Sequence, residues 1–173
     1  MEKHGVAKDA KIIDFGCGSG AIAREAEKLG WHDLQMTGLD GCEEIQKRCA
    51  QYKQYKELKT VFLGRDEFPA HWVDAFDYSV SLGTFIINHF PPSALDDMMN
   101  AVKKNGIIFF NSRKDQWVEI GLKPHLDKLL AEGKLEQIDE IEFHKYPNIR
   151  QEMKFFKVDV VGTMLAFRNL KPD

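Results

Sequence analysis

The chain has 173 residues, of which 43% are hydrophobic and 29% charged, which is the ordinary composition of one globular domain with a core of its own. Its formal net charge of -3 at pH 7 argues against a general electrostatic attraction to nucleic acid or to anionic membranes. No apolar run approaches the ~18 residues of a membrane-spanning helix, and the first residues lack the hydrophobic core of a signal peptide. We therefore expect a single cytoplasmic domain over residues 1–173, with no membrane partner and no bulk binding of nucleic acid.

The first predicted elements are a short apolar strand that begins at Lys11, a glycine-rich turn, and a helix over residues 21–29. Bare backbone at the glycines permits the unusual φ/ψ values of the turn and lets a ligand approach the N-terminus of the helix. Ser19 is the candidate cap of this helix, and Gly30 ends it. The glycines stand at alternate positions: Gly16, Gly18 and Gly20. The arrangement predicts a cofactor site at the turn.

The glycine spacing alone leaves two cofactor classes open, because the turn also satisfies the dinucleotide pattern G-x-G-x-x-G/A. Asp14 argues against a dinucleotide and favours a cofactor with a cationic group, since a carboxylate before the first glycine repels a pyrophosphate but suits an ammonium beside a sulfonium. The pattern Asp14-x-Gly16-x-Gly18-x-Gly20 resembles the first motif of the Rossmann-like S-adenosylmethionine-dependent methyltransferases. The resemblance implies that Asp14 shapes the ammonium end of S-adenosylmethionine, and that Gly16, Cys17, Gly18 and Gly20 hold its methionine and ribose against backbone.

Residues 34–39 form the second predicted strand, which ends at Asp40 and Gly41. Asp40 stands twenty residues past the last glycine of the turn, about where a Rossmann-type sheet places the acidic residue that binds the ribose diol. A carboxylate has the two acceptor oxygens that a vicinal diol needs. The alternative is that Asp40 caps a helix over residues 43–52. We assign Asp40 and the adjoining Gly41 to the cofactor.

The three cysteines are odd in number and lack paired C-x-x-C spacing, so the sequence predicts neither a disulfide framework nor a metal site. Cys17 and Cys42 lie in the two loops that we assign to the cofactor. The alternative for both is a small packing residue.

The third predicted strand covers residues 60–63 and follows a polar segment, residues 51–59, that is typical of a solvated helix end. In the resembled methyltransferases, an acidic residue and a backbone amide at the end of this strand recognise the adenine edge. The common pattern begins with Asp, but Gly64 occupies that position here. Arg65 and Asp66 are therefore the candidates for the adenine contact, with surface turn residues as the alternative.

The fourth predicted strand covers residues 77–82 and resembles the methyltransferase F-D-x-V strand that ends beside the methyl group. Ligands bind outside the carboxyl ends of strands in open α/β sheets, so we expect Ser81 and Leu82 to contact the cofactor. His89 is the titratable residue near this lip that could act as a general base, and a structural histidine is the alternative. The chain lacks an N-P-P-Y signature, which argues against DNA as the substrate.

The remaining elements complete an alternation of strands and helices up to residue 110, followed by a helix and an antiparallel strand pair. A Ser93-x-x-Asp96 capping box starts a helix that Asn105-Gly106 ends. The other predicted elements are a strand over 107–110, a helical region over 115–133 that Pro124 divides, and strands over 135–146 and 155–167 with a turn at Pro147-Asn148.

This order of elements also resembles the methyltransferase fold, over residues 11–167. We predict an α/β, Rossmann-like methyltransferase fold with a mostly parallel seven-stranded sheet, a C-terminal antiparallel strand pair and helices on both faces. A narrower resemblance, to the Williams-Beuren-region methyltransferase-like proteins, rests on residues 63–69, 81–85 and 111–113. Methyltransferases of this kind usually carry a helical lid ahead of the first strand. Here that segment is short, so the chain is a fragment, or the cofactor site is open, or a protein partner covers it.

The resemblance implies an S-adenosylmethionine-dependent methyltransferase that acts on an unidentified acceptor, a small molecule or a protein rather than DNA. In such an in-line displacement the protein contributes proximity, alignment and exclusion of water, and a base only where the acceptor loses a proton. Two alternatives stay open. One is a non-catalytic S-adenosylmethionine-binding or scaffold protein, and the other is an NAD(P)-dependent oxidoreductase that uses the dinucleotide pattern.

Overall fold

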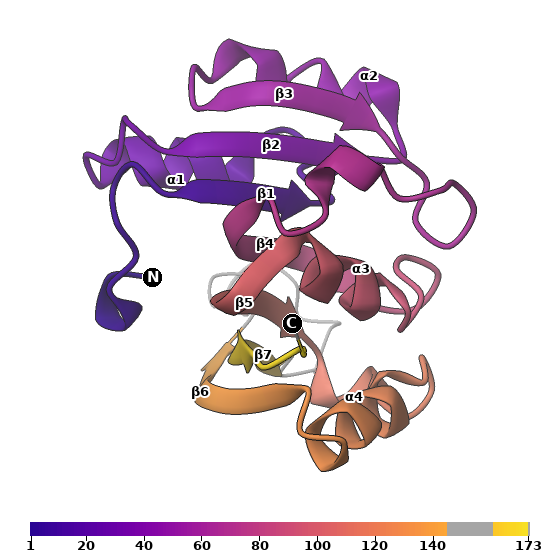
Figure 1. Cartoon of the computed structure of the whole chain (residues 1–173). Helices are drawn as coiled ribbons and strands as arrows, with labels where there is room; N and C mark the ends of the chain where they lie inside the picture. Colours follow the sequence, from indigo (N-terminus) through magenta and orange to yellow (C-terminus); the bar gives the residue numbers. More distant parts are fainter. Residues whose placement is uncertain (145–160, 173) are drawn as a thin grey trace.

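Seven strands form one sheet in the order β3-β2-β1-β4-β5-β7-β6 (Figure 1). The computed structural model describes residues 1–144 and 161–172. Neighbouring strands from β3 to β5 are parallel, whereas β7 is antiparallel to both β5 and β6. The strands are β1 Lys11–Phe15, β2 Gln35–Asp40, β3 Tyr55–Thr60, β4 Phe76–Phe85, β5 Val102–Ser112, β6 Leu135–His144 and β7 Val161–Asn169.

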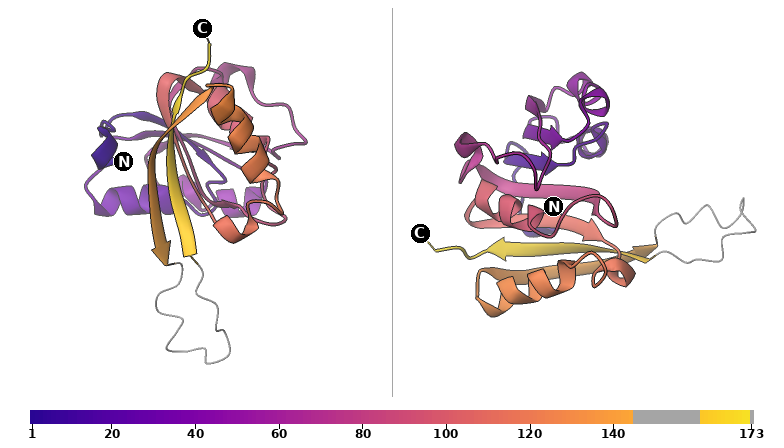
Figure 2. Two further views of the ribbon diagram at one scale, coloured as in Figure 1. Left: turned by 90° about the horizontal axis from the view of Figure 1, so that it is seen from below. Right: turned by 90° about the vertical axis from the view of Figure 1, so that its right-hand side faces the viewer.

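Helices cover both faces of the sheet, with α1 on one face and α3 and α4 on the other (Figure 1). Seen from below, the N-terminal turn η1 and helix α4 lie on opposite sides of the β6–β7 pair (Figure 2). The α-helices are α1 Ala21–Lys28, α2 Glu43–Gln46, α3 Ala94–Ala101 and α4 Leu122–Ala131. The short 3-10 helices are η1 Glu2–His4, η2 Cys49–Gln51, η3 Ala70–Trp72 and η4 Lys114–Gln116.

The two faces of the sheet have separate cores because side chains alternate along each strand. In β1, Ile12 packs on the α1 face and Ile13 on the α3 and α4 face, and both are fully buried. In β5, Phe109 and Phe110 divide in the same way. A strand covered on both faces has a continuous apolar sequence, which explains why this strand was predictable from residues 107–110.

The chain order reverses beside β1, because β2 and β3 lie on one side of it and β4 and β5 on the other. Such a reversal leaves a crevice at the carboxyl ends of the strands, where open α/β sheets bind ligands. It brings the glycine turn after β1 close to the exit of β4. The predicted fold class is confirmed, including the antiparallel strand pair and the helices on both faces.

The prediction of a third strand over residues 60–63 is wrong, because β3 overlaps it at Thr60 alone and otherwise lies in the segment that we assigned to a helix end. β3 is an edge strand with β2 as its neighbour, and its side chains are half-buried or exposed. Edge strands carry charged side chains rather than an apolar run, so this one lacked the sequence signal. The helix predicted over residues 43–52 is also shorter, since α2 ends at Gln46 and η2 follows it.

Two predicted helix caps differ from the structure. Gly20, not Ser19, is the N-cap of α1, and no side chain caps this helix. Ser93 is the N-cap of α3, but its hydroxyl makes no capping bond. Helix α3 ends at Ala101 instead of at Asn105-Gly106, because Val102 already pairs with β4 in the sheet. The turn at Pro147-Asn148 and residues 155–160 of the predicted last strand lie outside the described residues.

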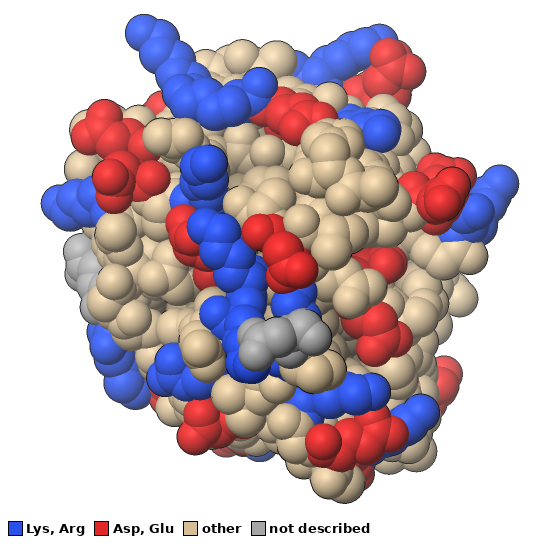
Figure 3. All heavy atoms as spheres, in the orientation of Figure 1, with Lys and Arg blue, Asp and Glu red and all other residues tan. Residues whose placement is uncertain are grey.

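The surface carries charges of both signs, interspersed over the face that Figure 3 shows. Several are exposed ion pairs, such as Lys103 with Asp77 at 2.7 Å and Lys123 with Asp127 at 2.6 Å. Within residues 1–144 and 161–172, none of the helices has both the length and the apolar character needed to cross a membrane.

Candidate cofactor and acceptor site

The glycine turn between β1 and α1 is hydrogen-bonded to the end of β2. The amides of Gly16 and Cys17 both donate to the Leu39 carbonyl oxygen, at 2.8 and 3.0 Å, and the Gly20 amide donates to the Cys17 carbonyl oxygen at 2.8 Å. The φ angles of Gly16, Gly18 and Gly20 are 72, 51 and 83°, in the left-handed region that strains other residues. The fold therefore fixes a stretch of bare backbone beside the carboxyl end of β2.

Close packing is a second reason for glycine at two of these positions. A Cβ at Gly16 would lie 2.5 Å from Thr84 Cγ2, and a Cβ at Gly20 would lie 2.6 Å from the Tyr52 ring. At Gly18 the nearest atom would be 3.9 Å away. The turn thus packs tightly against the exit of β4 and against the segment after η2, while Gly18 has room for a Cβ.

Asp40 joins the two loops that the sequence assigned to a cofactor. Its Oδ2 accepts a hydrogen bond from the Gly18 amide and its Oδ1 accepts one from the Cys42 amide, both at 2.9 Å. The alternative role of Asp40, as a helix cap, is wrong, because Cys42 is the N-cap of α2. The carboxylate therefore holds the glycine turn and the loop after β2 in one arrangement.

Asp14 lies in the interior of the sheet, with 1% of its surface exposed. The Tyr55 hydroxyl donates a hydrogen bond to its Oδ2 at 2.6 Å. Burial raises the pKa of Asp14 to about 7, and the negative charge of Asp40 acts in the same direction, whereas the Tyr55 hydrogen bond opposes them. The predicted effect of Asp14 on a ligand ammonium stays a prediction, and Tyr55 is a partner that sequence reasoning missed.

The buried thiols lie beside the glycine turn. Cys49 Sγ donates to the Gly18 carbonyl oxygen at 3.0 Å, so η2 supports the turn. The hydrogen bond with Cys49, followed by burial, raises the pKa of the Cys17 thiol far above its ordinary value. Cys17 is 4% exposed and packs in the core, whereas Cys42 is exposed.

A cavity of about 440 Å³ lies at the carboxyl ends of β1, β2, β3 and β4. This volume is in the range of ~300–1,000 Å³ that is typical of small-molecule sites. Residues that the sequence predicted for the site and that line this cavity are Gly16, Asp40, Gly41, Cys42, Leu82 and His89. Gly83 and Thr84, at the predicted lip after residues 77–82, line it as well. Residues that sequence reasoning missed are Ile45, Val61, Phe62, Leu63, Asn88 and Phe90. The missed group is mostly apolar, and apart from Ile45 in α2 it comes from loops, which have no periodic pattern in the sequence.

Ser81 is fully buried and holds the strand ends together. Its hydroxyl donates to the Phe15 carbonyl oxygen at 2.8 Å and is also hydrogen-bonded to the Thr84 hydroxyl. These contacts tie the end of β1 to the exit of β4. The assignment of Ser81 to the cofactor stays a prediction, since its hydroxyl is used within the fold.

The loop of Arg65 and Asp66 makes its polar contacts within itself. Both amides donate to the Phe62 carbonyl oxygen, at 3.0 and 2.9 Å, and the Asp66 carboxylate accepts a hydrogen bond from the Phe62 amide at 2.6 Å. The Arg65 guanidinium lies 4.5 Å from the centre of the Phe62 ring. These hydrogen bonds use the donors that we assigned to adenine, and the adenine contact of the two residues stays a prediction.

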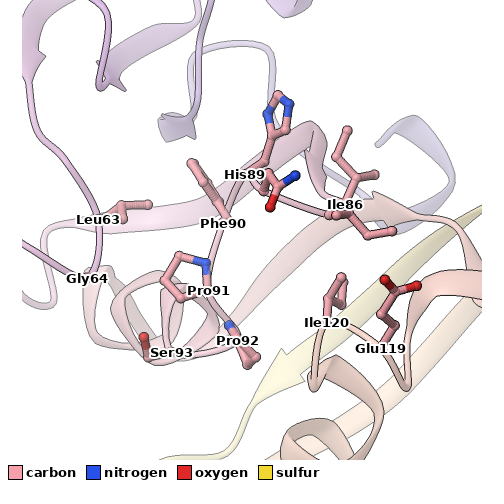
Figure 4. A pocket seen from close by; sticks show the side chains of 12 residues that line it. Leu63, Gly64, Ile86, His89, Phe90, Pro91, Pro92, Ser93, Glu119 and Ile120 are labelled. Carbon is pink, nitrogen blue, oxygen red and sulfur yellow. The ribbon is translucent and has the colours of Figure 1, made fainter.

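A second cavity of about 600 Å³ adjoins the first (Figure 4). Its lining comes from the loop after β4 and from the segment before α4, where Glu119 and Ile120 lie. The loop is tightly turned, because the Phe90 amide donates to the Thr84 carbonyl oxygen at 3.0 Å and Asn88 has a φ of 63°. Residues that line both cavities are Leu63, Asn88, His89 and Phe90. The structure therefore holds two neighbouring cavities with a shared wall.

The methyltransferase domain family matches residues 5–170, nearly the whole chain. The chain belongs to this family. The predicted membership of the Rossmann-like methyltransferases is thereby confirmed, while the narrower resemblance to the Williams-Beuren-region proteins stays a prediction. Comparison with curated proteins gave no match.

Solved structures resemble this methyltransferase domain over its whole length. The S-adenosylmethionine-dependent methyltransferase from Methanosarcina mazei shares 14% identity with a TM-score of 0.66, over 99% of this chain and 98% of its own. A complex of the Haloferax volcanii Trm112 methyltransferase activator contains a chain with 15% identity and a TM-score of 0.66, over 99% and 89%. The 4+2 cyclase SpnF shares 13% identity with a TM-score of 0.67, over 94% and 75%. At these identities the similarity shows the fold and not the substrate.

Proposed function

We propose that the protein transfers a methyl group from S-adenosylmethionine, its cofactor, to an acceptor bound in the second cavity. The observation that carries the proposal is the pair of adjoining cavities, the first bordered by the glycine turn and Asp40. Membership of the methyltransferase domain family supports this reaction. S-adenosylmethionine supplies a methyl group that its positive sulfur already activates, so the protein mainly aligns the reactants and excludes water.

The residues around the first cavity fit an adenosyl ligand. Each carboxylate oxygen of Asp40 accepts one backbone hydrogen bond and keeps a further lone pair for a ribose hydroxyl. Gly16 and Gly41 bring bare main chain into the wall. Two apolar side chains of the same cavity, Phe62 and Ile45, are 48% and 44% exposed and suit the faces of an adenine ring. We assign the ribose to Asp40 and the adenine faces to these two side chains.

The shared wall is the place where the methyl group passes between the cavities. His89 lines both cavities, and its ring, which points away from the second cavity in Figure 4, would have to turn toward the acceptor to accept a proton from its nucleophilic atom. Leu63 and Phe90 add apolar surface to this wall, beside the polar Asn88, and help to exclude water from the reacting atoms. His89 is thus the candidate base, and its role is confined to acceptors that lose a proton.

Titration calorimetry and a labelled transfer assay test the proposal. We expect S-adenosylmethionine to bind and NAD and NADP not to bind. Labelled methyl groups should then appear on a component of a cell extract. Binding without transfer would favour the non-catalytic alternative. Binding of NAD or NADP without S-adenosylmethionine would refute the methyltransferase assignment and favour the oxidoreductase.

A protein partner that covers the first cavity is a further part of this proposal. Leu82 at the first cavity and Ile87 at the second are 39% and 36% exposed, so both offer apolar surface to a partner. The Trm112 complex is an example of this fold bound to a protein. Variants Leu82→Glu and Ile87→Glu should lose a co-purifying partner, and an unchanged set of partners would refute this part.

A further inference from the structure

Among the residues that the structure describes, the lining of the second cavity contains one carboxylate, that of Glu119, and no Lys or Arg. Most of the lining residues are apolar, among them Leu63, Ile86 and Ile120 (Figure 4). Asn88, His89 and Ser93 add polar groups, and Glu119 is the one Asp, Glu, Lys or Arg. In Figure 4 the Glu119 carboxylate points toward the space below Ile86, whereas the His89 ring points away from it. A single, exposed carboxylate thus faces a cavity whose lining residues are mostly of apolar type.

No cation of the described chain compensates this charge. Glu119 makes no ion pair and no side-chain hydrogen bond with any residue in 1–144 or 161–172. The basic residues that flank it in the sequence are engaged elsewhere. Lys123 pairs with Asp127 at 2.6 Å, and Lys114 pairs with Glu142 at 2.9 Å. The cavity therefore presents an uncompensated negative charge.

The apolar lining strengthens the effect of this charge on a ligand. A ligand that fills the cavity displaces water from Glu119, and the attraction between opposite charges increases as water is removed. A ligand anion would be repelled, and a neutral ligand would leave the carboxylate without a partner, which is unfavourable. The lining selects for a ligand with both a cationic group and an apolar body.

We propose that the methyl acceptor is a small molecule with a cationic amine on an apolar body, and that Glu119 pairs with this cation. The inference rests on the proposed function, because it takes the second cavity as the acceptor site. Glu119 lines the second cavity but not the first, whereas His89 lines both cavities. Glu119 is therefore a positioning residue that anchors the acceptor away from the shared wall, and His89 keeps the role of base.

Three probes of similar shape and different charge test the inference: 2-phenylethylamine, 2-phenylethanol and 3-phenylpropionate. Each is titrated at pH 7 into the full chain, with and without S-adenosylhomocysteine, and followed by ligand-observed NMR. We expect the amine to bind about five- to tenfold more tightly than the alcohol, and the carboxylate to bind most weakly. Glu119→Gln should reduce the preference to about twofold. Glu67 is an exposed residue that lines neither cavity, so Glu67→Gln should preserve the preference for the amine.

Equal affinity for amine and alcohol, a preference for the carboxylate, no binding of the amine, or a preference that survives in Glu119→Gln would each overturn the inference. Thermal unfolding of both variants checks that they fold, as expected for exposed positions. Cofactor binding tests the proposed function separately from the preference for the amine. A chain that binds neither S-adenosylmethionine nor S-adenosylhomocysteine, yet prefers the amine through Glu119, refutes methyl transfer but leaves the cation preference standing.

Discussion

Asp40→Asn is the sharpest test of the cofactor site. The carboxylate accepts backbone hydrogen bonds from Gly18 and Cys42, both at 2.9 Å, and we assign the ribose hydroxyls to its remaining lone pairs. An amide keeps one acceptor oxygen, and its NH₂ group would face one of these two backbone donors. Loss of hydrogen bonds to a charged acceptor costs about 1.5–3 kcal/mol each. We expect affinity for S-adenosylmethionine to fall by about 2–3 kcal/mol, which is roughly 30- to 150-fold.

Titration calorimetry of both proteins with S-adenosylhomocysteine measures this loss. Asp9→Asn is the matched control, because Asp9 is exposed and lines neither cavity, and it should bind as the wild type does. Thermal unfolding of each protein without ligand separates weaker binding from partial unfolding of the loops. If the dissociation constant of Asp40→Asn lies within about twofold of the wild-type value, the ribose assignment is refuted.

Three further predictions concern the turn and its surroundings. Gly16→Ala should lower the free energy of unfolding by about 3 kcal/mol, because the new Cβ combines a positive φ with a contact of 2.5 Å to Thr84. Gly30 is the control: it has a φ of 76° but open space around it, so Gly30→Ala should lower the free energy of unfolding by about 1 kcal/mol. Urea titration measures both values. Asp14 binds a proton in the folded chain up to a pKa of about 7, whereas its ordinary value is 3.8, so its contribution to stability falls as the pH rises between these values. Asp14→Asn should therefore remove about 3 kcal/mol of the stability difference between pH 5 and pH 8, and an unchanged difference would contradict a buried, protonated carboxyl. Asp66→Asn should leave cofactor affinity unchanged if the carboxylate serves only its own loop, and a tenfold loss in calorimetry would restore its predicted contact with adenine.

The central part of the fold was predictable because its sequence signals are strong. Strands buried on both faces, such as β5, have continuous apolar runs, and the glycine turn has a spacing that few other structures need. The edge strand β3 was not predictable in this way. It contacts one neighbour and keeps most of its side chains near solvent, so its sequence resembles that of a solvated segment.

The site was predictable where spacing along the chain fixes geometry. Asp40 was found because β2 ends at a set distance from the glycine turn, and His89 because it follows the exit of β4. Phe62 was missed because an exposed apolar side chain on a loop shows no periodicity. Ile45 lies on α2, where an apolar side chain is more typical of packing than of a ligand site. Glu119 was missed because it comes from a segment far along the chain, which only the folded structure brings to the loop after β4.

The hydrogen bonds of Asp40 have a consequence for how a ligand arrives. Because they exist in the protein alone, the main chain around the sugar subsite is already ordered before any ligand is present. The entropy of arranging these two loops is then lost during folding and not at encounter, which favours fast capture and a small entropic cost of association. Phe62 and Leu82, which are 48% and 39% exposed, border the site outside this ordered main chain.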